Sequence, residues 1–427
     1  MQMEDRIALN NELHARPPMR LEGPMRCSHI VILNQNSEGY GLEFSDLCDK
    51  YNQPSPATDA RYHMVDIGSC RVKWESHTEA ESYTMLVPGN SQPYFEKSAL
   101  SYMPEAIQKS LLDAMFVGIH IEVIPSKELG EDYGYKKSQS LLGVDSIIGG
   151  WVADHNAVVW ASFRLDSEGF IRFVIVDVSL SVGMLARLVH RLLEIESYWT
   201  MALMALPMAR QSMSQLNLFE PELDYVMARL AANPDEDAQK ELLVAITDLA
   251  ARIEHMVSST AFRFSAARAY EGIARSRMAE LRENKLEGHE RISTFLDKRI
   301  TPAMRTCEAA ERRANELAVR VARAAGLLDT MVDMVRQRQN QSILKSMEQR
   351  AGMQVHLQQA VEGFSIIAIS YYGVNLVGYI LKAIHKLGLG LGLNIEVLTG
   401  ISVPIMLTLS FISVRMIRRA VNKKTGQ

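Results

Sequence analysis

Charged and imidazole side chains alternate along one segment that has the pattern of a strand. Lys73, Glu75, His77 and Glu79 occupy every second position around Trp74. Successive side chains of a strand point to opposite faces, so these four share one face. Glu75, His77 and Glu79 could offer three ligands to a divalent metal, or an acid and a base to a substrate. The simpler interpretation is a solvated charged face, with Trp74 turned to the core.

A second group with the same spacing lies near the start of the chain. Glu12, His14 and Arg16 also alternate, and they could complete such a site if this arm packs against the strand. The alternative is an arm whose Arg16 pairs with a carboxylate and which ends at Pro17-Pro18. The two groups together are the candidate polar cluster. Within this cluster the candidate metal ligands are Glu75, His77 and Glu79 on the strand. No cofactor is predicted.

Common catalytic motifs do not occur in the sequence. No G-x-x-x-x-G-K-[ST], H-E-x-x-H or G-x-S-x-G is present. Gly388, Gly390 and Gly392 alternate and lack the G-x-G-x-x-G spacing, so they predict a flexible turn rather than a nucleotide site. The sequence leaves the enzyme question open and favours a protein without catalytic activity.

Composition limits the class of protein. The 427-residue chain is 47% hydrophobic and 22% charged, which excludes wholesale disorder and a polytopic transporter. A net charge of −4 argues against a nucleic-acid partner. The four cysteines form no C-x-x-C pair and indicate reduced thiols in a cytosolic body. The length suits two or three domains.

The first 182 residues predict an α+β head with an antiparallel sheet. Short turns such as 68–69 and 154–156 imply antiparallel neighbours, which argues against a doubly wound nucleotide-binding fold. Helices are expected at 44–51 and 104–114. The expected strands lie at 28–34, 62–67, 70–76, 82–87, 118–124, 147–153, 157–165 and 170–176.

From residue 183 onward the apolar pattern changes to the helical period. After Pro234 only Pro302 and Pro404 occur. Apolar residues recur at spacings of three and four over 242–256 and 317–335, and 284–288 is the best turn signal between them. We therefore expect an antiparallel coiled-coil hairpin or stalk, with an ordinary globular bundle as the alternative. Arg338 and Ser342 fall on the seam, where the pairing should loosen.

Two apolar segments near the end of the chain have the length of membrane spans. Residues 363–381 are nineteen without a charge, and residues 397–414 are eighteen. Each is close to the roughly 20 residues that cross a bilayer as a helix. Residues 1–12 contain no apolar run typical of a signal peptide. A C-terminal transmembrane hairpin is expected. The resulting organisation is a head at 1–182, linking helices at 183–235, a stalk at 236–362, spans at 363–381 and 397–414, a loop at 382–396 and a tail at 415–427.

Basic residues predict the orientation of these spans. The tail at 415–427 carries five Lys or Arg residues and no acid, whereas the loop at 382–396 carries only Lys382 and Lys386. The more basic side stays in the cytoplasm, and an even number of spans puts the head on the same side. We expect the inner membrane, with head and tail cytoplasmic. The partners expected are the lipid bilayer and cytosolic proteins.

Three residues in the first span point to self-association. Asn375 carries an amide inside an apolar helix, which is unfavourable against lipid. Gly373 and Gly378 permit a second helix to approach closely. Together they predict a contact between helices in the membrane and a homo-oligomer of unspecified size.

Three motifs carry a resemblance over essentially the whole chain. They are Asn11–Pro17 (NELHARP), Lys73–Glu79 (KWESHTE) and Ala368–Tyr372 (AISYY). On these the chain resembles a bacterial family of membrane-anchored proteins that contain a domain of unknown function. The resemblance implies the membrane anchor and supplies no chemistry.

A second, architectural resemblance is to CorA-type magnesium channels. A cytosolic α/β body, stalk helices and a C-terminal two-helix hairpin are similar, and Tyr372–Asn375 (YGVN) is similar to the Gly-Met-Asn filter of that family. In that family the motif ends the first span, whereas six apolar residues follow it here, 376–381. Lys382, His385 and Lys386 in the following loop would also repel divalent cations.

The leading hypothesis is therefore a membrane-anchored interaction or scaffold protein, homo-oligomeric, with a cytosolic head. A CorA-like divalent cation channel or transporter is the first alternative, and a membrane-tethered metal-dependent enzyme is the second. A divalent metal is the only cofactor that these alternatives would require.

Overall fold

A computed structural model describes residues 20–34, 41–57, 60–130, 132–232, 234–386 and 394–425, together with Arg6 and Asn10. The chain divides into two compact units, Met1–Ala325 and Gly326–Gln427. The first is α+β and the second is helical. The fold class expected from the sequence, a sheet-containing head followed by long helices, is confirmed at that level.

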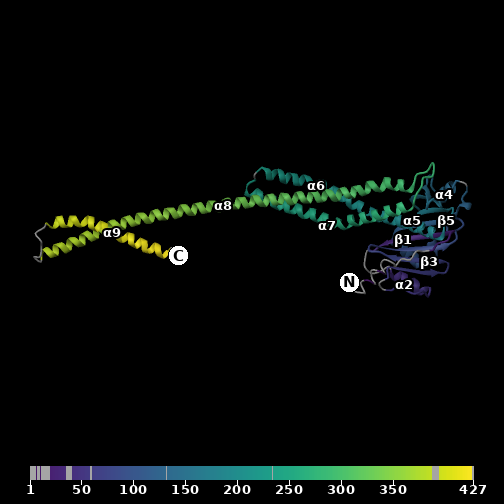
Figure 1. The fold of residues 1–427 in the computed structure, drawn as a ribbon, viewed down its shortest axis with the longest axis horizontal. Helices are drawn as coiled ribbons and strands as arrows, with labels where there is room; N and C mark the ends of the chain where they lie inside the picture. The colour runs from purple at the N-terminus through teal and green to yellow at the C-terminus, as the bar shows by residue number, and fades with distance from the viewer. Residues whose placement is uncertain are drawn as a thin grey trace. The chain divides into compact units, whose positions relative to one another are not determined.

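Unit 1 is built on one sheet, which Figure 1 shows where β1, β3 and β5 are labelled. The sheet has eight strands in the order β2-β3-β4-β1-β5-β8-β7-β6. The strands are β1 (Met25–Leu33), β2 (Tyr62–Ile67), β3 (Cys70–Ser76), β4 (Ala80–Pro88), β5 (Met115–Pro125), β6 (Ile148–Val152), β7 (Ala157–Leu165) and β8 (Ile171–Asp177).

The expectation of a wholly antiparallel sheet is wrong at one place. β5 and β8 pair in parallel, whereas the other neighbouring strands pair antiparallel. The reason is the long connection at 126–147, which contains η2 (Ser126–Glu128) and α4 (Tyr135–Leu142). It returns the chain so that β6 starts in the direction of β5, and the third strand of the β6–β7–β8 meander then runs parallel to β5. The sheet is mixed.

Helices cover both faces of the sheet. On one face, Ile30, Phe44 and Trp74 share a core with α2 (Gly41–Lys50), η1 (Ala99–Tyr102) and α3 (Glu105–Asp113). On the other, Val31 and its neighbours pack against α5 (Val182–Leu203), α7 (Glu236–Glu280) and the start of α8 (Ile292–Lys386). The central strands β1, β4 and β5 are consequently buried on both sides. This double coverage decides what happens to the polar residues on β3.

The long helices of unit 1 form a bundle of more than two members. α7 starts at an N-cap, Asp235, whose side chain accepts from the Ala238 N–H at 2.9 Å. The segment that joins α7 to α8 includes the predicted turn at 284–288, and it is bound to β6 by two backbone hydrogen bonds between Trp151 and Asn284, of 3.1 and 2.8 Å.

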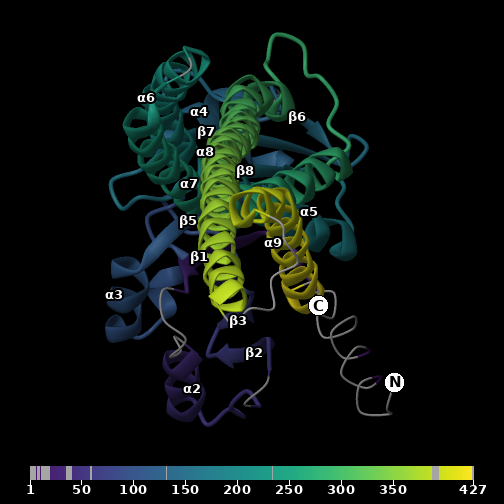
Figure 2. The same cartoon turned by 90° about the vertical axis from the view of Figure 1, so that its left-hand side faces the viewer.

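A third helix, α6 (Ala205–Ala231), lies beside α7 and the first part of α8 (Figure 1 and Figure 2). Arg313 of α8 holds the Glu220 carboxylate of α6 in a bidentate pair, with both distances 2.7 Å. Arg320 of α8 contacts Asp224 of α6 at 2.7 Å. The two-helix hairpin expected from the seams therefore packs against a third helix. This helix, α6, is formed by residues that were interpreted only as linking helices.

Unit 2 consists of the rest of α8 and of α9 (Ile395–Thr425). α8 is a continuous helix of 95 residues, so the predicted first span is its last part rather than a separate helix. Both α8 and α9 are long and apolar enough to cross a membrane, and their most apolar 18-residue windows are only 6% and 11% buried. The predicted loop glycines 388, 390 and 392 lie outside the described residues.

The predicted contact residues in the first span have two different environments. Gly373 lies against Met406 of α9, whose side chain would collide with an added Cβ, and Gly378 lies against Thr399. Both glycines thus permit close packing inside one chain. Asn375 is exposed, and its Nδ2 donates to the Tyr371 carbonyl oxygen one turn back at 3.1 Å.

Candidate functional site

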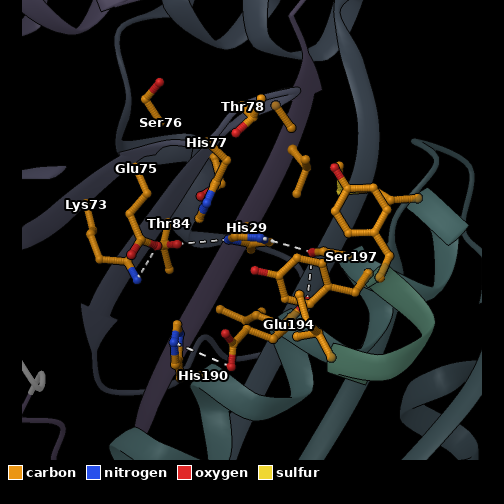
Figure 3. Close-up of a pocket in the computed structure, with 18 of the residues that line it drawn as sticks. His29, Lys73, Glu75, Ser76, His77, Thr78, Thr84, His190, Glu194 and Ser197 are labelled. Carbon is orange, nitrogen blue, oxygen red and sulfur yellow. Dashed lines mark hydrogen bonds and ion pairs between the residues drawn. The ribbon is translucent and has the colours of Figure 1, made fainter. Parts of the chain in front are cut away.

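A cavity of about 260 Å³ lies in unit 1, between the sheet face of β1, β3 and β4 and the helices α5 and α7 (Figure 3). Its sheet side is polar, with His29, Lys73, Glu75 and Thr84. Its helix side mixes His190 and other polar residues of α5 with apolar and aromatic residues of α5 and α7. The cavity therefore has two chemically different walls.

Lys73 and Glu75 form the ion pair at one end of this cavity. The Lys73 Nζ lies 2.6 Å from a Glu75 carboxylate oxygen, and the two side chains are only 4% and 7% exposed. The prediction that they share one face of the strand is right, and Trp74 lies in the core of the opposite face. The expectation that this face is solvated is wrong, because helices α5 and α7 cover it.

His29 lies on the floor of the cavity, on β1. Its Nδ1 is 2.8 Å from the Thr84 hydroxyl on the paired strand β4, and its Nε2 is 3.5 Å from the Ser197 hydroxyl of α5. Ser197 donates its own proton to the Leu193 carbonyl oxygen at 2.7 Å. With its proton directed to Leu193, the Ser197 hydroxyl is placed to accept from His29, which favours the tautomer that carries its proton on Nε2 and accepts from Thr84 at Nδ1. In this arrangement His29 does not activate Ser197 as a nucleophile.

Burial keeps the His29 imidazole neutral. Desolvation, followed by the nearby Lys73 charge, lowers the pKa of His29 to about 3. Desolvation also lowers the pKa of His190, partly opposed by Glu194. The cavity thus contains imidazoles that hydrogen-bond without charge at neutral pH.

Helix α5 contributes a polar stripe at helical spacing. His190, Glu194 and Ser197 lie on the same side of this helix and line the cavity. The His190 Nε2 is 3.6 Å from Glu194, and the Glu194 carboxylate lies 2.7 Å from the Nε of Arg277 on α7. The positive charge of Arg277, which does not line the cavity, therefore already balances the negative charge of Glu194.

The other predicted strand residues separate after β3 ends at Ser76. His77 lines the cavity from the β3–β4 connection. Glu79 does not line it; its carboxylate accepts from Arg263 Nη2 at 2.8 Å and from the Tyr270 hydroxyl, both on α7. Burial, and then Glu79, raise the pKa of Tyr270. Glu79 thus binds the β3–β4 connection to α7 through Arg263 and Tyr270.

The predicted metal ligands are not brought together. Glu75 and His77 line the cavity and Glu79 points to α7. Among the residues that the structure describes, no group of three or more His, Cys, Asp and Glu side chains is placed to hold a metal ion. Glu12, His14 and Arg16 lie outside the described residues, so their contribution stays a prediction.

Several cavity residues were missed by the sequence interpretation. His29 stands alone in an apolar strand, and nothing in its neighbours distinguishes it from a core histidine. The α5 stripe could have been found, because His190, Glu194 and Ser197 interrupt an apolar helix at spacings of four and three. Their meeting with Lys73 depends on how α5 packs on the sheet, which no local pattern encodes.

The arrangement is suited to binding more than to catalysis. Hydrogen-bonding groups and a buried ion pair line the sheet side, and Tyr198 and Tyr270 stack with ring centroids 5.8 Å apart on the helix side. The class of protein so defined is a mixed α+β head with an internal polar cavity, followed by two helices apolar enough to cross a membrane. A family model described as "Protein of unknown function (DUF3422)" matches residues 1–421, and the chain belongs to this family. A search of curated proteins finds no match to the chain.

Proposed function

We propose that the protein is a membrane-anchored interaction protein, held in the bilayer by residues 363–381 of α8 and 397–414 of α9. The supporting observation is the exposure of the apolar side chains along both helices. They include Phe364, Ile367, Tyr379, Ile380, Val397, Ile401, Ile405 and Phe411. Exposed apolar surface on this scale is unfavourable in water and favourable in hydrocarbon.

The basic tail supports an orientation with the head in the cytoplasm, at the inner membrane of a bacterial cell. The experiment is extraction of the isolated membranes that contain the full-length protein. We expect the protein to remain in the pellet after alkaline carbonate and to enter the supernatant only with detergent. Release by carbonate alone would contradict integral insertion.

Self-association is part of the proposal. Residues 336–360 of α8 are exposed on every side, and they carry apolar residues without cover. These include Ile343, Leu344, Met347, Met353, Val355 and Leu357. An unpacked helix gains little stability in water, and a second copy of the same helix would cover these side chains.

The test of self-association is the mass of the full-length protein in mild detergent. We expect an oligomer. Asn375→Leu should weaken it, because the part of the Asn375 amide that points away from its own helix would lose its hydrogen-bond partner in the neighbouring copy. Ser365→Ala is the matched control, since Ser365 donates to Val361 of its own helix at 2.8 Å. A monomeric mass for the unmodified protein would contradict the proposal.

The two alternatives have less support. Tyr372–Asn375 lies inside α8 with Gly373 against Met406 of the same chain, unlike a filter at the end of a span. A metal-dependent enzyme would need ligands that the described residues do not gather. Metal flux into proteoliposomes would support the channel after all. Bound metal in the purified protein would support the metal-dependent enzyme.

A ligand-binding head is the second candidate function, favoured by the cavity on the sheet. This cavity brings a buried ion pair and imidazoles together with apolar side chains, the combination that is typical of small-molecule sites. The experiment is native mass spectrometry of the detergent-solubilised protein. We expect a small-molecule adduct that Leu193→Trp, which fills the cavity from α5, removes without releasing the protein from the membrane.

A further inference from the structure

We propose that the cavity between the sheet and α5 binds a small organic carboxylate, with its anionic group at Lys73 and its apolar body against the tyrosine side. The inference rests on the proposal that the head binds a ligand, and it names the class of that ligand.

Lys73 is the group that requires an acceptor. An ammonium group has three N–H donors. Within the described part of the chain its ion-pair partner is Glu75, at 2.6 Å, and its side chain is only 4% exposed. A buried donor that is left without an acceptor costs free energy, and a carboxylate oxygen in the cavity is an acceptor of the strongest kind.

The electrostatic field at the Lys73 and His29 side of the cavity favours an anion. Lys73 lowers the pKa of both His29 and His190, and at each imidazole its effect is larger than the opposing effect of Glu75. At His29, on the cavity floor, Lys73 has the largest effect of any charge, whereas at His190 the effect of Glu194 is larger than that of Lys73. Since the imidazoles are neutral, they can donate to or accept from a ligand without repelling it.

A cationic ligand is disfavoured by the state of the two acids. Glu75 is paired with Lys73, and Glu194 lies 2.7 Å from Arg277. Each acid thus already has a cation at its carboxylate, whereas the Lys73 ammonium has donors beyond the one that Glu75 accepts. A carboxylate adds an acceptor to the existing pair instead of breaking it.

The opposite wall determines the rest of the ligand. Leu193, Tyr198 and Met201 of α5 and Ile273 of α7 line this side. A volume of about 260 Å³ is slightly below the ~300–1,000 Å³ of sites for drug-sized molecules. The ligand is therefore a single ring or a short chain that carries one carboxylate.

The test uses the full-length protein in detergent and three carboxylate probes, namely benzoate, phenylacetate and hexanoate. Benzamide and benzylamine are the neutral and cationic counterparts. Isothermal titration calorimetry should detect at least one carboxylate, bound at least tenfold more tightly than benzamide and benzylamine. Preference for benzylamine or benzamide would overturn the carboxylate class and leave a ligand-binding head. Absence of binding by all five probes would overturn the carboxylate class, while an adduct in native mass spectrometry would still support a ligand.

The double variant Lys73→Met/Glu75→Gln tests the residues, because it removes the anchor without leaving a buried unpaired charge. It should weaken the binding of the carboxylate at least tenfold. The matched control is Glu105→Gln/Lys109→Met, which makes the same changes on the exposed side of α3. It should leave binding unchanged. Equal binding by both double variants, with both folded by circular dichroism, would overturn the assignment of Lys73.

Discussion

The two parts of α8 differ in how they use similar apolar residues. In residues 292–324 the apolar side chains are buried at regular spacing, for example Leu317 at 1% exposure and Ala324 at 0%. In residues 336–386 of the same helix they are mostly exposed, for example Leu344 at 65% and Tyr379 at 71%. The first part is packed by its own chain, whereas in the second the chain gives cover mainly where α9 contacts α8, as at Gly373 and Gly378. The same apolar composition therefore forms a core in one part of α8 and an exposed surface in the other, depending on which elements pack against it.

The largest effect that separates the two parts is expected from truncation. Deletion of residues 363–427 removes both apolar segments and leaves the buried part of α8 intact. We expect the shortened protein to move completely from the membrane to the soluble fraction, because no long apolar surface remains to insert. Fractionation followed by immunoblotting measures this. Continued sedimentation with membranes would mean that the head has its own attachment.

A matched pair of substitutions sharpens the comparison within α8. Leu317→Ala should lower the free energy of unfolding of the head by about 2–5 kcal/mol, the usual cost of a cavity in a packed core. Leu344→Ala should change that free energy by less than about 0.5 kcal/mol, because Leu344 belongs to unit 2 and lies outside the core of unit 1, whether or not a second copy covers it. Urea unfolding followed by circular dichroism provides both values. Equal losses would contradict the assignment of Leu344 to a part of α8 outside the core of unit 1.

The connection between β3 and β4 provides a smaller effect. Glu79→Ala leaves Arg263 and the Tyr270 hydroxyl without their partner, and we expect a loss of about 1–3 kcal/mol in stability. Glu241→Ala, which removes a pair with Arg229 at 3.5 Å on the surface, should cost only ~0–1 kcal/mol. If the two variants lose the same free energy of unfolding, the contact of Glu79 with α7 stabilises the protein no more than a surface ion pair does.

The smallest effect, counted per pH unit, is the pH dependence of stability that His29 causes. Its pKa falls from 6.5 to about 3 on folding, so between these values the unfolded state binds more protons and stability decreases as the pH falls. Relative to His29→Gln, the unmodified protein should lose about 1.4 kcal/mol per pH unit within that window. Burial raises the pKa of Glu122 and Glu196 to about 7, which acts in the opposite direction. Both proteins share those carboxyls, so the comparison cancels them; parallel pH profiles would refute a buried neutral His29.

Local periodicity explains what the sequence predicted correctly. Alternation placed Lys73 and Glu75 on one face and Trp74 on the other, and the turn at 284–288 separates α7 from α8. The charge-free segments at 363–381 and 397–414 lie in two helices apolar enough to cross a membrane. Each of these features depends on residues that are close in sequence.

What was not predicted depends on distant segments. The burial of Lys73 and Glu75 requires α5 and α7, which begin more than a hundred residues later. The parallel pairing of β5 with β8 results from the 126–147 connection, and the third bundle helix comes from residues interpreted as linkers. Strand alternation also failed for Glu79, because β3 ends at Ser76 before the pattern does.

The most direct test of the membrane anchor is a pair of reporter fusions. A reporter that is active only in the cytoplasm is placed after Gln427 in one protein and at Gly390, between the two apolar segments, in another. We expect activity for the fusion at Gln427 and none for the insertion at Gly390, with both proteins in the membrane fraction. Activity at both positions would contradict a transmembrane hairpin, and activity at Gly390 alone would reverse its orientation.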